Sequence, residues 1–284
     1  MSVIEIEKIV VIGWDNFTAS LVEGIKKKYP MCEILCADSV TDQILQAKQQ
    51  GLISDSPSQK IMIYEGADFV IINQSSQEII ATIKNIKSLL SRGTYIIDFQ
   101  PVKSKLFEEI LDLLESQNPY VSCFVFLNDI PNEFTIRGDV FKDQIVAIIS
   151  DTSTKVLQTM REFWNIVDAK IVPTSAEFFD EILSQTSQSV ALISHMFTHI
   201  LQEDSWADTL FFGFYNKDLR NFLTPTCTKK QYSAQSIIEN ADNIRRTLSF
   251  IKREIDVLDQ MIDNEDIMKL SEYLVISQNF KNRL

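Results

Sequence analysis

A short turn near the N-terminus holds residue types that can bind a dinucleotide. The apolar segment Lys8–Ile12 leads into the turn Gly13-Trp14-Asp15-Asn16-Phe17-Thr18, and a helical pattern follows. In a strand, turn and helix of this kind, the backbone N–H groups of the turn and the start of the helix hold the pyrophosphate. We therefore expect Gly13, Asn16 and Phe17 to contact a nucleotide cofactor, NAD or NADP.

The turn keeps the first glycine of the three in the dinucleotide fingerprint. Asp15 stands at the second glycine position and Thr18 at the third. The second glycine lets the backbone approach the phosphates, so a carboxylate there would repel a phosphate by about 4 kcal/mol at ~4 Å and an effective dielectric of ~20. That energy corresponds to about a thousandfold in affinity. Alternatively, Asp15 caps the following helix, because aspartate is a favoured N-cap residue.

A second acidic residue, Asp38, follows the apolar run Glu33–Ala37. Its spacing from Gly13 fits the acidic residue that binds the adenosine ribose, and such a residue favours NAD over NADP. A solvated aspartate in a turn is the structural alternative. We add Asp38 to the expected cofactor-binding residues, together with Gln74, which follows the run Phe69–Asn73.

These residues need a parallel sheet to bring them together, and the first half of the chain has that pattern. Short β-branched runs alternate with longer segments of helical spacing. This alternation is typical of a doubly wound, Rossmann-type α/β fold with helices on both faces of a parallel sheet. The expected strands are Lys8–Ile12, Glu33–Ala37, Phe69–Asn73, Thr94–Ile97, Val121–Phe126, Gln144–Ile149 and Lys170–Val172. The expected helices are Ser20–Lys28, Ser39–Gln50, Gln77–Leu90, Lys105–Glu115 and Ser153–Asn165.

The pattern changes near Pro173, and helical spacing occupies the rest of the chain. Long helices are expected at Ala176–Gln202, Ser233–Leu258 and Asp266–Gln278. The first of these has little charge in its middle, and a helix that apolar is usually buried, often between subunits. We therefore expect a dinucleotide-binding domain at 1–173, an all-α dimerisation and substrate domain at 174–284, and a homodimer.

The composition disfavours several kinds of partner. Lys plus Arg total 27 against 39 for Asp plus Glu, and this net charge of −12 disfavours nucleic acid and anionic membrane surfaces. No apolar stretch approaches a membrane span, and the N-terminus lacks the pattern of a signal peptide. We expect a cytoplasmic protein without a membrane partner, and the four cysteines, which form no CxxC pair, fit a reducing compartment.

A metal site is not expected. The two histidines, His195 and His199, are four residues apart on a predicted helix. This spacing can bind a metal where carboxylates converge on it. Packing within the helical domain is the interpretation we favour, and Phe178 and Phe179 are likewise interpreted as core or interface residues.

The layout of the chain resembles the prephenate/arogenate dehydrogenase family over nearly its whole length. KIVVIGWDNFTASLVEGIKKKYP is similar to the family's first strand, turn and helix, ILCADS to its second strand, and QQGLISDS to its G-L-I-D link. The resemblance implies a Rossmann domain followed by helical dimerisation elements. It also implies an NAD(P)-dependent oxidoreductase of aromatic amino acid biosynthesis that acts on a prephenate-like carboxylate.

The catalytic positions that this resemblance implies are replaced. Residues 97–103 are similar to the family's D-x-x-S-V-K segment, in which Asp98, Val102 and Lys103 match and Pro101 replaces the serine. Phe124 stands where the histidine of the family's G-G-H-P element polarises the substrate hydroxyl. No catalytic residue is therefore intact, and losing a proton-transfer group typically costs about two to four orders of magnitude in rate.

Residues that could bind a carboxylate ligand are partly retained. Gln185 and Gln188 stand at the two histidines of the family's S-H-x-x-H motif, and glutamine forms hydrogen bonds but exchanges no proton near neutral pH. Residues 215–220 resemble a substrate-binding run, with Asp218 and Arg220 matching. An arginine can hold a carboxylate through two hydrogen bonds. The expected substrate-binding residues are Lys103, Gln185, Gln188 and Arg220.

The sequence leaves three functions open. The first is a divergent NAD(P)-dependent oxidoreductase in which Lys103 and Arg220 clamp an anionic substrate. The second is a non-catalytic dimeric relative that binds a ligand or regulates. The third is an enzyme of another reaction type that uses the same cleft without nicotinamide, which polar replacements such as Asp15 and Asn16 would permit.

Overall fold

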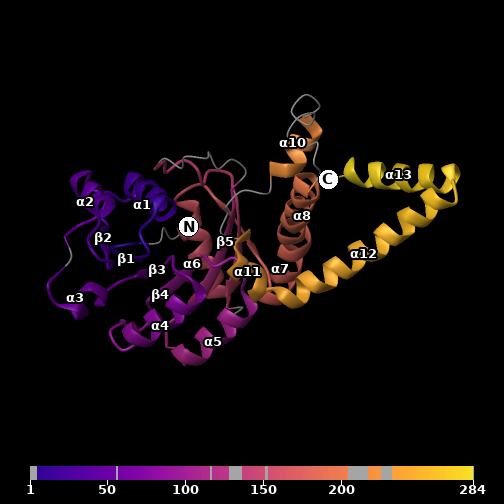
Figure 1. The fold of residues 1–284 in the computed structure, drawn as a ribbon. Coiled ribbons are helices and arrows are strands. Elements are labelled where there is room, and N and C mark those ends of the chain that lie inside the picture. Colours follow the sequence, from indigo (N-terminus) through magenta and orange to yellow (C-terminus); the bar gives the residue numbers. More distant parts are fainter. Residues whose placement is uncertain are drawn as a thin grey trace. The chain divides into compact units, whose positions relative to one another are not determined.

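A computed structural model gives the fold of the chain (Figure 1). The structure describes residues 5–55, 57–115, 117–127, 136–150, 153–203, 217–224 and 232–283. The chain forms two compact units, which we call unit 1 (Met1–Asp180) and unit 2 (Glu181–Leu284). The division between them falls inside helix α7 (Ala176–Leu183), a few residues after the expected boundary at Pro173.

Unit 1 is built on a seven-stranded sheet with the order β2-β1-β3-β4-β5-β6-β7. Neighbouring strands are parallel except β5 and β6, which are antiparallel. The expected doubly wound α/β fold is confirmed, but the expectation of a wholly parallel sheet is wrong at β6, because an apolar run does not specify strand direction. The strands are β1 (Lys8–Ile12), β2 (Glu33–Cys36), β3 (Phe69–Ile72), β4 (Tyr95–Asp98), β5 (Tyr120–Phe126), β6 (Ile145–Ser150) and β7 (Lys170–Pro173).

Several helices of unit 1 begin where a side chain accepts hydrogen bonds from the first turn. Thr41 caps α2, Ser153 caps α6, and Ser75 with Glu78 forms a capping box at α4. Besides α7, the helices are α1 (Asn16–Lys28), α2 (Asp42–Gln49), α3 (Lys60–Tyr64), α4 (Ser76–Ile86), α5 (Ser104–Leu114) and α6 (Thr154–Asn165). Helix α3 lies outside the sequence predictions, since five residues are too few to display a helical period.

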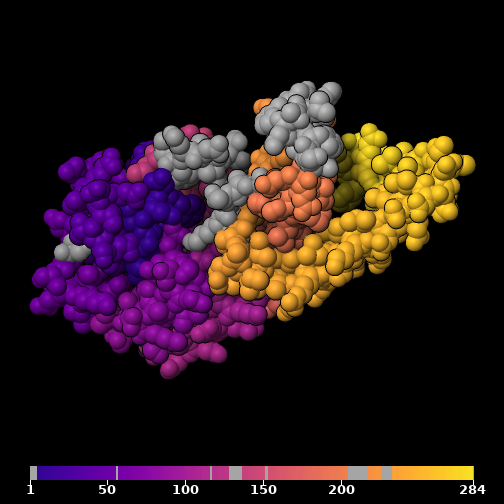
Figure 2. Space-filling model, viewed as in Figure 1, coloured from indigo at the N-terminus to yellow at the C-terminus, as the bar shows by residue number. Residues whose placement is uncertain are grey.

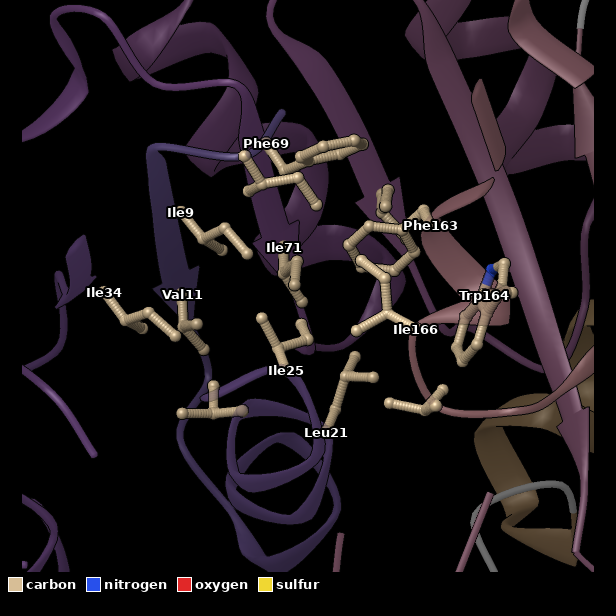
Figure 3. Packing of buried hydrophobic residues seen from close by; sticks show 14 of the residues in the cluster. Ile9, Val11, Leu21, Ile25, Ile34, Phe69, Ile71, Phe163, Trp164 and Ile166 are labelled. Atoms are coloured by element: carbon tan, nitrogen blue, oxygen red, sulfur yellow. The ribbon is translucent and has the colours of Figure 1, made fainter. Parts of the chain in front are cut away.

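The two faces of the sheet bury separate apolar clusters. Ile9 and Val11 of β1 lie in the cluster formed with α1 and α6, where Trp164 is buried (Figure 3). Val10 and Ile12, the alternate residues of the same strand, lie in the cluster formed with α4 and α5. Because successive side chains point to opposite faces of a strand, continuous apolar runs fit a sheet that is covered on both sides.

The described part of unit 2 is helical. The long helix expected at Ala176–Gln202 is present as α7, a π-helix and α8 in direct succession, whereas the helix expected at Ser233–Leu258 is divided at Asn240. The backbone of Asn240, with φ of −104° and ψ of 23°, departs from helical geometry. The elements are η1 (Ser184–Gln188, the π-helix), α8 (Ser189–Glu203), α10 (Lys217–Leu223), α11 (Ala234–Glu239), α12 (Ala241–Asp263) and α13 (Ile267–Lys281).

A membrane-spanning helix is not found among the described residues, where no helix is both long and apolar enough to cross a bilayer.

Candidate functional site

The turn between β1 and α1 requires glycine at its first position. Gly13 has a φ of +89°, and a Cβ placed on it would lie 2.1 Å from the carbonyl oxygen of Asn73. Any side chain would therefore clash with the backbone at the end of β3 as well as strain its own. Gly13 thus allows the carboxyl ends of β1 and β3 to approach closely.

Asp38, at the end of β2, binds the backbone of this turn. Its Oδ2 accepts hydrogen bonds from the N–H of Gly13 at 2.8 Å and from the N–H of Trp14 at 2.7 Å. The Cys36 thiol lies 3.5 Å from the same oxygen, and burial raises the pKa of Cys36 to about 12, so the thiol stays protonated and donates. The carboxylate expected to bind a ribose therefore has backbone donors of the protein as its partners.

Asp15 caps helix α1. Its Oδ1 accepts from the N–H of Thr18 at 2.9 Å, and the Thr18 hydroxyl accepts from the N–H of Asp15 at 2.9 Å, so the pair forms a capping box. The other carboxylate oxygen accepts from the side-chain amide of Asn73 at 2.7 Å. The geometry therefore agrees with the interpretation of Asp15 as the N-cap of α1. Because Asp15 is the cap, α1 begins at Asn16, ahead of the expected Ser20.

The backbone donors of the turn are consequently engaged within the protein. The N–H groups of Gly13 and Trp14 donate to Asp38, that of Asp15 donates to Thr18, and that of Thr18 donates to Asp15. A pyrophosphate in this fold depends on donors from the same turn and helix start. These four N–H groups are therefore occupied within the protein and can donate to a pyrophosphate only if the side chains of Asp38, Thr18 and Asp15 move.

The other expected cofactor residues lie at the same edge of the sheet or in the core. Phe17 is partly buried and packs against the core of unit 1, with its ring centroid 4.8 Å from that of Phe99 and 5.4 Å from that of Phe141. The side chain of Gln74 accepts from the hydroxyl of Thr82 at 2.7 Å. Asn16 is the first residue of α1, and its carbonyl accepts from Ser20.

Lys103 is fully buried at the start of α5. The sequence instead predicted that this side chain clamps an anionic substrate. Its Nζ donates to the carbonyl oxygen of Cys123 at 2.8 Å and lies 4.0 Å from Oδ1 of Asp98. The side chains of Lys103 and Asp98 are both 0% exposed. The ammonium is therefore placed to balance a buried carboxylate, and a ligand arriving from solvent cannot reach it without opening the core.

Asp98 is the centre of this buried network. Its Oδ2 accepts from the Tyr120 hydroxyl at 2.7 Å, and its Oδ1 accepts from the N–H of Gln100 at 2.7 Å. Burial and the neighbouring Asp98 raise the pKa of Tyr120, so the phenol remains a donor. Hydrogen bonds to both oxygens and a nearby cation offset the cost of burying the charge.

Asp180 joins α7 to the start of α5. Its Oδ1 accepts from the N–H of Lys103 at 2.8 Å, and its Oδ2 accepts from the N–H and hydroxyl of Ser104 at 2.9 and 2.6 Å. Burial raises the pKa of Asp180 against these hydrogen bonds. Sequence reasoning missed this residue, although an acidic residue directly after the apolar Phe178-Phe179 pair was a usable signal.

Phe124 lies in an aromatic cluster. Its ring centroid is 5.0 Å from that of Phe126 and 5.3 Å from that of Phe179. Phe179 is buried, whereas the adjacent Phe178 is 58% exposed. The environment of Phe124 is apolar, so the position offers no group that could polarise a hydroxyl.

In unit 2, the two expected glutamines have different roles. Gln188 is fully buried, where its amide nitrogen donates to the hydroxyl of Ser236 at 2.8 Å and its oxygen accepts from Asn240 at 2.7 Å. Gln188 therefore crosslinks η1 to α11 and to the residue that separates α11 from α12. Gln185 is exposed and lies 3.4 Å from Glu181 on the preceding turn.

Arg220 lies exposed on α10. Asp218 is exposed on the same helix, and Tyr215 lies outside the described residues. His195 and His199 are exposed on α8, so the expectation that they pack inside the helical domain is wrong. No group of three or more potential metal-ligating residues occurs in the part of the chain that the structure describes.

The chain was compared with known proteins. No family model matches it. Among solved structures, it is similar to prephenate dehydrogenase from A. aeolicus in complex with hydroxyphenyl propionate and NAD+, with a TM-score of 0.86 and 16% identity over 99% of each chain. It is also similar to Synechocystis arogenate dehydrogenase, with a TM-score of 0.82 and 15% identity over 97% of this chain and 99% of that one. Its fold is that of the prephenate/arogenate dehydrogenases.

The prephenate/arogenate dehydrogenase fold is thus retained with a different set of side chains at its functional positions. Asp15 and Thr18 hold the turn, Lys103 is buried, Phe124 is in an aromatic cluster and Gln188 is a structural crosslink. Arg220 is the expected ligand-binding side chain that is charged and exposed. The differences from the family's motifs therefore lie in side chains and not in the fold.

The buried ion pair gives a stability prediction. Lys103→Met should lower the free energy of unfolding by about 3–5 kcal/mol, because it leaves the carboxylate of Asp98 buried without its cation. As a control, Lys170→Met removes an exposed pair with Asp143 and should cost less than about 1 kcal/mol. Urea unfolding followed by circular dichroism measures both values, and equal losses in the two variants would contradict the assigned role of Lys103.

Proposed function

We propose that this protein is a dimeric binding protein for a small carboxylate ligand and does not carry out nicotinamide-dependent oxidation. The observation that carries this proposal is the arrangement of Asp15, whose carboxylate caps α1 at the place where the fold presents donors to a pyrophosphate. At ~4 Å and an effective dielectric of ~20, the repulsion between this carboxylate and a phosphate is about 4 kcal/mol. The repulsion of a bound phosphate by Asp15 is therefore larger than the stabilisation of about 1 kcal/mol that a typical N-cap gives its helix.

The aromatic environment of Phe124 supports the same proposal. Removing a proton-transfer group typically costs about two to four orders of magnitude in rate. The neighbouring rings of Phe126 and Phe179 supply no substitute for such a group. A ligand could therefore be held without being oxidised.

A divergent NAD(P)-dependent oxidoreductase acting on a prephenate-like carboxylate is the second candidate. The placement of Asp38 at the end of β2 favours it, because an acidic residue there can bind a ribose once it releases the turn. The A. aeolicus prephenate dehydrogenase structure, which has the same fold, contains NAD+. The two candidates differ in whether the unmodified protein binds the cofactor.

Cofactor binding separates the candidates. The wild-type protein should give no thermal shift with millimolar NAD or NADP, whereas Asp15→Asn should bind NAD measurably, because asparagine keeps the cap and removes the charge. The expected gain in affinity is up to about a thousandfold. Asp42→Asn, which removes an exposed carboxylate from the first turn of α2, is the matched control. Saturable binding of NAD by the wild-type protein would instead support the oxidoreductase.

Ligand binding tests the role of Arg220. Hydroxyphenyl propionate should bind the wild-type protein in a calorimetric titration, and Arg220→Ala should weaken binding by about tenfold or more, since a charge-assisted hydrogen bond contributes about 1.5–3 kcal/mol. Lys217→Ala, on the same helix, should leave the affinity unchanged. No binding by the wild-type protein, or equal losses in both variants, would count against a carboxylate held by Arg220.

We also propose that unit 2 forms the interface of a homodimer. Helix α13 has no buried residue, although Leu274, Val275 and Ile276 are consecutive apolar residues that are 58%, 53% and 62% exposed. Consecutive residues on a helix point in different directions, so a partner has to cover more than one face of α13. The surface of α12 and α13 is drawn in yellow in Figure 2. A second copy of the chain offers the same apolar surface in return.

Light scattering tests the dimer. The wild-type protein should have twice the mass of the chain at micromolar concentration, and Leu274→Lys combined with Ile276→Lys should be monomeric, because two ammonium groups would be buried in the interface. Met31→Lys changes a residue of unit 1 that is 93% exposed and should leave the mass unchanged. A monomeric wild-type protein would exclude this interface.

A cytoplasmic location is part of the proposal. The described cysteines, Cys32, Cys36 and Cys123, are free and buried. Burial raises the pKa of the Cys32 thiol to about 11 and that of the Cys123 thiol to about 12. Thiols of this kind behave as small core residues, which is the usual state in a reducing compartment.

A further inference from the structure

A cavity of about 590 Å³ lies at the amino ends of the strands of unit 1. Phe69 and Tyr95, the first residues of β3 and β4, line it, as does Val156 of α6. Because β1, β3 and β4 are parallel, this cavity is at the opposite edge of the sheet from the turn at Gly13. It is therefore separate from the site discussed above, and its volume is within the usual range for small-molecule sites.

Two cations, Arg92 and Lys155, line the cavity. Among the described residues, neither Arg92 nor Lys155 forms an ion pair or a side-chain hydrogen bond. The chain has a net charge of −12, so acidic side chains are plentiful, but the fold places none of the described ones in ion-pair distance of Arg92 or Lys155. Lys155 also lies in the first turn of α6, where the helix dipole is positive.

The acidic residues that line the cavity, Asp68 and Glu5, offset the positive charge of Arg92 and Lys155 only in part. The Oδ2 atom of Asp68 accepts hydrogen bonds from the N–H groups of Glu7 and Lys8 at 2.8 and 3.0 Å, which disperse its charge. Glu5 is exposed, so solvent screens its charge. The acidic side chains therefore offset the two cations only in part.

The remaining lining residues suit an apolar body. The rings of Phe69 and Tyr95 are 5.4 Å apart, and the Tyr95 hydroxyl lies 3.1 Å from that of Thr159. From this combination of the Tyr95 ring, which packs on the buried Phe69, a paired hydroxyl and two cations without a described partner, we infer a second ligand site for a small organic anion, a carboxylate or phosphate monoester with an aromatic body. Such an anion would place its charge between Arg92 and Lys155 and its body against Tyr95.

Calorimetric titrations with simple probes test this site. Phenylacetate or phenyl phosphate should bind saturably in the millimolar range or tighter. Neutral phenylacetamide lacks the negative charge and inorganic phosphate lacks the aromatic body, so each should bind at least about tenfold more weakly. The two anionic probes distinguish a carboxylate from a phosphate. Equal affinity for phenylacetamide, or for inorganic phosphate, would overturn the proposed combination.

Variants locate the binding. Arg92→Gln combined with Lys155→Gln should weaken binding at least about tenfold, and Thr159→Trp, which fills the cavity, should abolish it. Arg161→Gln, on α6 but outside the cavity, is the matched control and should have no effect. The titrations are carried out in the Arg220→Ala background, which removes the carboxylate site proposed in unit 2, so failure of this site and failure of that site are distinguishable. No saturable binding in this background would overturn the proposal.

Discussion

Backbone N–H groups at strand ends and helix starts need acceptors, and aspartates supply many of them in unit 1. A strand that ends, or a helix that begins, leaves donors with no carbonyl in reach, and an unsatisfied buried donor costs about 1–3 kcal/mol. A carboxylate can accept from two such donors at once and spread its charge over them. Asp38, Asp68 and Asp180 each accept from two backbone N–H groups, and Asp15 and Asp98 each accept from one backbone N–H and one side-chain donor. They connect β1 to β2, β1 to β3, and α7 to α5.

The aspartates that accept these hydrogen bonds also reduce the number of backbone donors that a phosphate ligand can use. In a dinucleotide-binding protein, the turn after β1 keeps its donors for a ligand, whereas here Asp15 and Asp38 occupy them from within the chain. An internal carboxylate has a large advantage over a ligand, because its placement costs no translational freedom once the protein is folded. The stability of the turn and its affinity for phosphate are therefore in competition.

In both units, buried polar side chains bind other parts of the protein and stabilise the fold. The ammonium of Lys103 neutralises Asp98 in the core of unit 1, and Gln188 links η1 to Ser236 and Asn240 in unit 2. Buried polar groups that are fully paired make one packing arrangement more favourable than others. Gln188 is the last residue of the π-helix η1, and π-helical turns occur frequently at functional sites.

The amino-acid sequence by itself determined the strands and most of the helices, in their order along the chain, whereas α3 and the division at Asn240 were not predicted. Continuous β-branched runs gave strands buried on both faces, helical spacing gave their covering helices, and Gly13 marked a turn that no other residue could adopt. These features are local, because backbone geometry and side-chain periodicity act over a few residues. Tertiary structure decided the direction of β6, the burial of Lys103 and the capping of α5 by Asp180. Each of these depends on which distant segment packs against the residue, and the environment of a charge decides whether it meets a ligand or another part of the chain.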